Sequence, residues 1–202
     1  MKSKKKAIES SNNKITSIII CGVGGQGILL SSDILCTAAF LAGYDVKKSE
    51  IHGMAQRGGS VITHARFGKK VYSPLVEEGG ADFILAFEKL EALRYSYFLR
   101  NNGTIIVNEL QLPPTSVLAG ERDYPANIIE TLKKFANVDV IPAQEIALKL
   151  GNVRVANVVL LGSIARYLKF PEELWTEAIK ENVKPQYLDL NIRAFKQGLS
   201  IP

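Results

Sequence analysis

The chain has 202 residues, of which 47% are hydrophobic and 22% charged, a composition typical of a globular protein with one good core. Five lysines and one glutamate in residues 1–14 account for most of the net charge of +5, so the remainder lacks the basic excess of a nucleic-acid-binding domain. The two cysteines, Cys21 and Cys36, form neither a disulfide framework nor a four-cysteine iron–sulfur site, and we expect a cytoplasmic protein.

Residues 1–14 have too little apolar content to fold, and we expect a disordered basic tail followed by one domain over residues 15–202. No apolar stretch follows the lysines directly, which argues against a secretory signal. Asp33 and Asn157 interrupt the two most apolar runs, so we expect no membrane-spanning segment.

Strand and helix signals alternate along the first two thirds of the chain. Strands are predicted at 15–21, 45–50, 59–68, 81–87, 103–109 and 138–142, and helices at 28–42 and 88–99. The remainder is predicted to be helical, with one helix from Pro142 to Gly151, one over 153–168, one that has Pro171 at its first position, and a last one that ends at Gly198. This alternation predicts a three-layer α/β/α domain with a largely parallel, Rossmann-like sheet.

A glycine-rich loop lies between the first strand and the first helix. The sequence CGVGGQGILL fits G-x-G-x-x-G, with Gly22, Gly24 and Gly27 as the three glycines and Gly25 as an extra one. A strand, a glycine loop and a helix N-terminus together form an anion-binding cradle. We therefore predict that the loop holds an anion, with Gln26 as an additional donor.

A nicotinamide dinucleotide is one candidate for this anion. Such a site needs an acidic residue at the end of the second strand, and Asp45 and Glu50 are candidates by position. The second strand, however, carries Lys47 and Lys48, whereas a central parallel strand should be almost wholly apolar. The lysines favour an edge strand, or a strand that lies against another protein.

Two further interpretations of the loop remain. Adenylating enzymes carry a similar G-x-G-G-x-G loop but also an Asn-Arg-Gln stretch, which is missing at the corresponding Ser-Glu-Ile-His-Gly. Alternatively, the glycines only permit a tight turn between strand and helix, although Gly25 and Gln26 exceed what a turn requires.

A second glycine stretch, EIHGMAQRGGSV over residues 50–61, lies between two predicted strands. Loops on such sheets often carry function. We take five of its residues as substrate-binding or interface residues: His52, Gln56, Arg57, Gly58 and Gly59.

The two stretches together resemble the gamma-type domain of the 2-oxoacid:ferredoxin oxidoreductases. The form HGMAQRGG is similar to the branch of small subunits that act on indolepyruvate. The resemblance covers residues 16 to about 198 and includes NVVLLGSIA at 157–165 and the ending Asn191-x-x-Ala194-Phe195-x-x-Gly198.

This resemblance implies a small subunit of an enzyme that oxidatively decarboxylates a 2-oxoacid, such as indolepyruvate or another aryl pyruvate, to an acyl-CoA, with electrons passing to ferredoxin. The complex is expected to use thiamine diphosphate, Mg, 4Fe-4S clusters and coenzyme A. This chain has no Gly-Asp-Gly with a downstream Asn-Asn and no cysteine-rich motif, so a larger partner subunit is expected to hold the thiamine and the clusters. No metal site and no catalytic residue are assigned to this chain.

The glycine loop is then expected to hold a phosphate of coenzyme A, and Arg57 to contact a phosphate, a substrate carboxylate or the partner subunit. Asp82 and Glu88 are interpreted as ordinary strand-end residues. A free-standing NAD(P)- or nucleotide-binding protein and a purely architectural subunit remain alternatives, and a homodimer of the isolated chain is left open. We expect no nucleic acid and no membrane as partners.

Overall fold

The computed structural model describes residues 14–52 and 58–202. Six strands form one sheet in the order β2-β3-β1-β4-β5-β6. Their bounds are β1 Thr16–Val23, β2 Asp45–His52, β3 Ser60–Gly68, β4 Ala81–Ala86, β5 Leu99–Asn108 and β6 Asn137–Ile141. β1, β4, β5 and β6 pair in parallel, and β3 runs antiparallel to β1 and β2. All strands except β3 therefore run in one direction, which confirms the largely parallel sheet.

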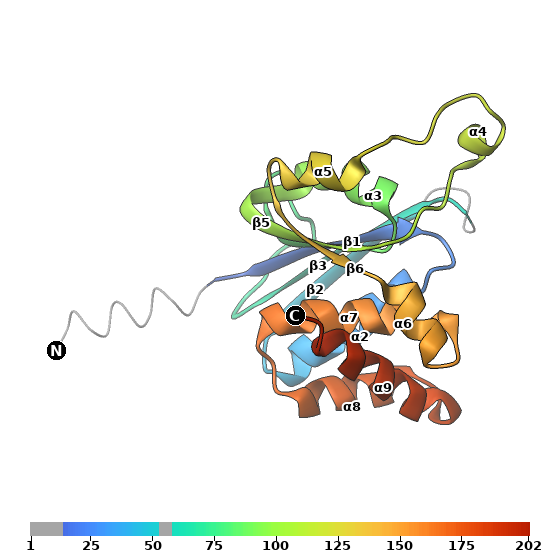
Figure 1. Ribbon diagram of the computed structural model, residues 1–202. Coiled ribbons are helices and arrows are strands. Elements are labelled where there is room, and N and C mark those ends of the chain that lie inside the picture. The colour runs from blue at the N-terminus through green and yellow to red at the C-terminus, as the bar shows by residue number, and fades with distance from the viewer. Residues whose placement is uncertain (1–13, 53–57) are drawn as a thin grey trace.

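Helices cover both faces of this sheet, as Figure 1 shows. α3 and α5 lie on one face, and α2, α6 and α7 lie on the other, with α8 and α9 packed beyond them. The bounds are α2 Ile28–Leu41, α3 Lys89–Arg94, α4 Thr115–Leu118, α5 Ile128–Lys133, α6 Ala143–Lys149, α7 Ala156–Leu168, α8 Glu172–Asn182 and α9 Leu188–Leu199. Three short 3-10 turns add η1 Ser96–Phe98, η2 Val153–Val155 and η3 Pro185–Tyr187. The predicted α/β fold is confirmed.

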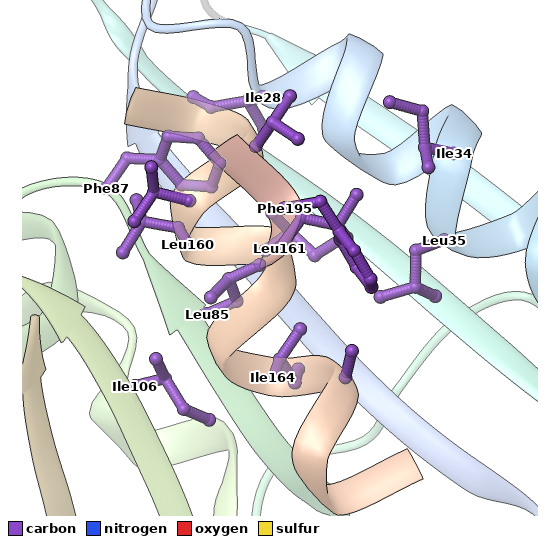
Figure 2. Packing of buried hydrophobic residues seen from close by; sticks show 14 of the residues in the cluster. Ile28, Ile34, Leu35, Leu85, Phe87, Ile106, Leu160, Leu161, Ile164 and Phe195 are labelled. Atoms are coloured by element: carbon purple, nitrogen blue, oxygen red, sulfur yellow. The ribbon is translucent and has the colours of Figure 1, made fainter. Parts of the chain in front are cut away.

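β1 is the central strand of the core because both of its faces are covered. Ile18 and Ile20 belong to the hydrophobic cluster on the α2 and α7 face, whereas Ile19 and Cys21 belong to the cluster on the α3 and α5 face. This is the alternation that a strand imposes on consecutive side chains. Figure 2 shows the larger cluster, where side chains of α2, β4, β5 and α7 meet.

β2 is an edge strand, as its lysines predicted. Lys48 forms ion pairs with Asp33 of α2 and with Glu50 of the same strand, so its charge lies against helix α2 rather than inside the sheet. The second strand of the fold is thus separated from β1 by the antiparallel β3.

Several element boundaries differ from the sequence prediction. The helix expected over 88–99 ends at Arg94, because η1 follows and turns Phe98 edge-on against His64 of β3 at 5.2 Å. Pro171 is the residue before α8 rather than its first residue. The expected tail falls almost wholly on residues 1–13, which lie outside the described residues.

The last helix was predicted to end at Gly198. This residue instead lies inside α9, where it contacts α7. A Cβ atom at Gly162 of α7 would overlap the carbonyl oxygen of Phe195, and one at Gly198 would overlap the carbonyl oxygen of Val159. The two helices therefore cross with their backbones in direct contact, and both glycines are required for this approach.

We expect Gly162→Ala and Gly198→Ala each to lower the free energy of unfolding by about 3 kcal/mol, the upper part of the usual range for overpacking. Urea unfolding followed by circular dichroism measures this. Gln197→Ala, at an exposed position beside Gly198, is the control and should change stability by less than about 0.5 kcal/mol. Equal stability of Gly162→Ala and the control would contradict the close crossing.

His64 makes stability depend on pH. Its side chain is buried, its Nδ1 accepts a hydrogen bond from the Val76 backbone N–H at 3.0 Å, and burial lowers its pKa. The unfolded chain therefore binds a proton more readily than the folded chain, so the free energy of unfolding should fall as the pH drops below about 6.5.

The measurement is urea unfolding between pH 7.5 and 5 for the native chain and for His64→Gln, which should lack this component of the pH dependence. An NMR titration of the His64 ring in the native chain should give a midpoint below the ordinary value. A midpoint at or above 6.5 would contradict the assignment.

Candidate functional site

The two glycine stretches meet at the carboxyl end of β1. The Gly24 N–H donates to the Gly59 carbonyl at 2.8 Å, and the Gly58 N–H donates to the Gly24 carbonyl at 3.3 Å. These bonds continue the β1–β3 ladder beyond its last pair, Val23 with Ser60. Two loops that are far apart in the sequence therefore form one surface.

The shape of the first loop depends on its glycines. Gly25 and Gly27 have φ angles of 103° and 81°, in the left-handed region that favours glycine. A Cβ atom at Gly22 would lie 2.7 Å from Phe87 Cβ, and one at Gly27 would lie 2.6 Å from Asn157 Nδ2. The turn geometry thus accounts for three of the glycines, and it also brings the backbone close to Phe87 and Asn157.

Gln26 braces this loop. Its Oε1 accepts from the Val23 N–H at 2.6 Å, and its Nε2 donates to the Phe87 carbonyl at 3.0 Å. The side-chain amide thereby ties the loop to the residue that follows β4. One hydrogen of Nε2 is used in this bond, so a hydrogen bond from Gln26 to a ligand would need the other hydrogen. That donation stays a prediction.

The start of α2 favours an anion. Gly27 is the N-cap residue and gives no side-chain cap, and the first turn holds no acidic residue. The backbone N–H groups of a first helical turn have no intrahelical acceptor and carry partial positive charge. This end of α2 is therefore a suitable place for a phosphate or carboxylate.

Beside the loop lies a cavity of about 500 Å³, which we call the glycine-loop cavity. It is lined by Gly25, Gln26, Gly27, Leu30, Phe87, Asn108, Leu110, Leu112, Gln144, Val153, Arg154, Ala156, Asn157 and Leu160. These residues come from the carboxyl ends of β4 and β5, from α2 and α6, and from the start of α7. Ligands of open α/β sheets bind at this edge.

The lining of the glycine-loop cavity includes several side-chain amides and one cation, Arg154. The Asn108 Nδ2 donates to the Phe87 carbonyl at 3.1 Å and to Gln144 Oε1 at 2.6 Å, and Asn157 Nδ2 donates to the Gly27 carbonyl at 3.3 Å. Arg154 is exposed, and its guanidinium makes no hydrogen bond or ion pair to a described residue. No acidic side chain of the described chain lines this cavity.

Sequence reasoning missed Arg154, Asn108 and Gln144. Asn108 is the last residue of β5, and Gln144 follows β6 closely, so a systematic reading of strand ends could have found both. Arg154 precedes the predicted motif 157–165 and carried no signal of its own, because only the packing of α7 beside α2 brings it to the loop.

Glu88 is more than an ordinary strand-end residue. Its side chain is 1% exposed and accepts from the Glu91 N–H at 3.0 Å, the Leu112 N–H at 3.0 Å and the Tyr124 hydroxyl at 2.5 Å. It thus caps α3 and holds the segment that carries Leu112 to the cavity. Asp82, at the opposite edge of the sheet, is also buried and accepts from the Ser17 N–H at 2.9 Å while pairing with Arg100.

Glu91 secures the second glycine stretch. Its carboxylate accepts a hydrogen bond from the Ser60 hydroxyl, which lies 2.9 Å from the Tyr95 hydroxyl. Ser60 directly follows Gly59, so helix α3 fixes the position at which this stretch joins β3.

Neither cysteine offers a reactive thiolate. Burial raises the pKa of Cys21 well above its usual range and that of Cys36 to about 12, so both thiols stay protonated. His52 ends β2 opposite Val61, and Gln56 and Arg57 lie outside the described residues. Among residues 14–52 and 58–202, no group of three or more His, Cys, Asp or Glu could hold a metal ion. No described helix is long and apolar enough to cross a membrane.

The sheet also lacks the acidic residue that a dinucleotide site requires. The strand beside β1 on this side is the antiparallel β3, and Asp45 and Glu50 lie one strand further away on β2. Asp45 accepts from the Val71 N–H and pairs with Lys47, and Glu50 pairs with Lys48. Neither is positioned for the ribose of a dinucleotide bound at the loop.

Comparison with known proteins decides the family. The profile of the pyruvate ferredoxin/flavodoxin oxidoreductase family matches residues 17–201. The chain belongs to this family. The resemblance that its two glycine stretches indicated is therefore confirmed, and the chain is a subunit of an oxidoreductase.

Relatives in this family are named indolepyruvate oxidoreductase subunit IorB. The chain is 42% identical to that of Thermococcus kodakarensis over 191 residues, covering 91% of this chain and 94% of the relative. It is 46% identical to that of Archaeoglobus fulgidus over 187 residues, covering 90% and 92%. The common gamma subunit of pyruvate/ketoisovalerate oxidoreductases of Pyrococcus furiosus is 26% identical to this chain over 180 residues. The match covers 88% of this chain and 91% of that subunit.

Solved structures of the family share the fold. A 2-oxoglutarate:ferredoxin oxidoreductase from Magnetococcus marinus, with 2-oxoglutarate, coenzyme A and succinyl-CoA bound, aligns with a TM-score of 0.73 at 21% identity. The alignment covers 93% of this chain and 31% of that one. A keto/oxoacid ferredoxin oxidoreductase gamma subunit from Geobacter sulfurreducens gives 0.68 at 24% identity, covering 91% and 95%.

Gly25 and Gly27 form a matched pair for testing the loop. Both have positive φ, but a Cβ at Gly25 meets open space, whereas one at Gly27 meets Asn157. We expect Gly25→Ala to cost about 1 kcal/mol of unfolding free energy through backbone strain alone. Gly27→Ala should cost about 1–3 kcal/mol more, because it also forces Asn157 away. Urea unfolding checks this difference, and equal costs would contradict the tight contact.

Proposed function

We propose that the chain is the small subunit of a 2-oxoacid:ferredoxin oxidoreductase that acts on indolepyruvate or a related aryl pyruvate. The observation that carries this proposal is the 42% and 46% identity, over at least 90% of this chain, to two subunits named for indolepyruvate. Identity to a gamma subunit named for pyruvate and ketoisovalerate is only 26%.

The residues of this chain do not fit the iron–sulfur clusters, thiamine diphosphate or Mg that the reaction requires. Two cysteines in the whole sequence cannot supply the four thiolates of an iron–sulfur cluster. The described residues also offer no carboxylate cluster at the carboxyl edge of the sheet, since Glu88 and Glu91 are committed to internal hydrogen bonds. We therefore assign thiamine diphosphate, Mg, the clusters and the electron transfer to ferredoxin to a larger partner subunit.

We assign the coenzyme A side of the reaction to the glycine-loop cavity. Its donors suit a phosphate: the first turn of α2, which has no side-chain cap, and the guanidinium of Arg154, which pairs with none of the described residues. In this role the chain binds and orients the acyl acceptor while chemistry takes place on the partner. The Magnetococcus enzyme, which shares this fold, has coenzyme A bound in its solved structure.

Arg57 and His52 keep their predicted roles. Arg57 follows Gln56 and directly precedes Gly58, which is hydrogen-bonded to the first loop. From this place in the sequence, we propose that Arg57 contacts a phosphate, a substrate carboxylate or the partner subunit. His52 remains a hydrogen-bonding candidate of the same surface.

The test is 2-oxoacid-dependent reduction of a viologen dye by this chain, alone and with the larger subunit. The isolated chain should show no turnover, and the complex should use indolepyruvate better than pyruvate or 2-oxoglutarate. In the complex, Arg154→Gln should raise the KM for coenzyme A roughly ten- to hundredfold, the effect of one charge-assisted hydrogen bond, without changing the KM for the oxoacid.

Arg193→Gln is the matched control, because Arg193 pairs with Asp189 on the exposed face of α9. It should leave both constants unchanged. Turnover by the isolated chain would refute the subunit assignment, and a changed KM for the oxoacid in Arg154→Gln would refute the coenzyme A assignment.

A further inference from the structure

A second cavity adjoins the glycine-loop cavity. It has a volume of about 300 Å³ and lies where the turn between α8 and α9 meets α2 and the start of α7; we call it the α8–α9 cavity. Leu30, Arg154 and Asn157 line both cavities. Figure 1 shows the α8–α9 turn on the same side of the molecule as the carboxyl end of β1. The two cavities are therefore neighbours, and Arg154 lines both of them.

The α8–α9 cavity is basic. Arg154 and Lys184 are its charged lining residues, and its lining in the described chain includes neither aspartate nor glutamate. Lys184, like Arg154, is exposed and makes no side-chain hydrogen bond or ion pair within the part of the chain that the structure describes. Other cations of α8 and α9 are paired: Lys180 with Glu177, Arg193 with Asp189, and Lys196 with Glu172.

The turn that carries Lys184 is fixed on both sides. The Asn182 Nδ2 donates to Thr37 Oγ1 of α2 at 3.1 Å and to the Ala178 carbonyl at 2.8 Å. Asn191 of α9 donates from Nδ2 to the Tyr187 carbonyl at 2.8 Å. The backbone that places Lys184 beside the cavity is therefore held in position before any ligand arrives, which reduces the entropic cost of binding.

The two cavities offer places for two anionic groups. One group would lie at the start of α2, and the other between Arg154 and Lys184. An adenine nucleotide with a diphosphate and a further phosphomonoester on its ribose has the required chemistry, and coenzyme A and NADP both carry this arrangement.

We propose that Lys184 and Arg154 form a subsite for the ribose phosphomonoester of coenzyme A, so that the chain selects coenzyme A over its dephosphorylated form. This proposal rests on the proposed function, which assigns a phosphate of the same molecule to the glycine-loop cavity. Of the two nucleotides we choose coenzyme A, because it is the one that the proposed function places at the glycine-loop cavity. Lys184 is then a specificity-determining residue that the sequence pattern did not mark.

The experiment compares coenzyme A with dephospho-coenzyme A in the assembled enzyme. Calorimetry gives the two dissociation constants, and the steady-state assay gives the two KM values, because both compounds carry the reacting thiol. The native enzyme should bind coenzyme A at least tenfold more tightly. Lys184→Gln should weaken coenzyme A roughly tenfold and leave dephospho-coenzyme A unchanged, since one charge-assisted contact is lost. Lys180→Gln, on the exposed face of α8, is the control and should change neither constant.

The outcomes separate this inference from the proposed function. If both compounds bind equally well, or if Lys184→Gln weakens both by the same factor, the phosphomonoester subsite is refuted while coenzyme A binding stands. If neither compound binds, both proposals are refuted. A selective loss of NADPH relative to NADH in Lys184→Gln, with coenzyme A unaffected, would assign the subsite to NADP. Weaker subunit association in this variant, measured by ultracentrifugation, would make Lys184 an interface residue. Either result would overturn the proposal.

Discussion

The backbone bonds between Gly24 and the pair Gly58–Gly59 are the contact on which the candidate site depends. They exist because β3 enters the sheet antiparallel to β1, so that its start lies beside the end of β1. A parallel neighbour would place its start at the opposite edge of the sheet. The reversal of a single strand thereby joins two glycine stretches and displaces β2, with its charged residues, to the edge.

The electrostatic potential at the joined loops depends on which face of the sheet carries the acidic residues. Glu88 and Glu91 are buried on the α3 face, where each accepts several hydrogen bonds. On the other face, the cavities beside α2 are lined by amides, apolar groups and two cations that pair with no described residue. The carboxylates therefore stabilise the frame of the loops, while the open side is left with a positive potential that attracts anions.

The close crossing of α7 and α9 connects this chemistry to the packing. Gly162 and Gly198 let the two helices approach closely, and this places the start of α7, with Arg154 and Asn157, against the loop that begins α2. The same bundle sets the α8–α9 turn beside α2 through Asn182 and Thr37. Residues that line the cavities are thus held in place by helix contacts outside the cavities.

Much of this arrangement could be predicted from the sequence. The apolar run of β1, the glycines of the first loop and the lysines of β2 indicate a central strand, a tight turn before a helix and an edge strand, because these signals are local properties of neighbouring residues. The order of two glycine stretches also indicated the family. Boundaries such as the end of α3 at Arg94 were not predictable, since Phe98 leaves the helical pattern to pack against His64 from another strand.

The sequence by itself determined the fold class, the family and the positions of both glycine stretches, because strand period, helix period and turn chemistry are written in residues close together in the chain. Only the tertiary structure decided that the stretches touch and that Gln26 and Glu88 act as braces. It alone also brought Arg154 and Lys184 to neighbouring cavities. The physical reason is that contacts such as Glu88 with Leu112, Gln26 with Phe87 and Asn157 with Gly27 join residues from 24 to 130 positions apart, and only the packing of the helices on the sheet fixes which of them meet.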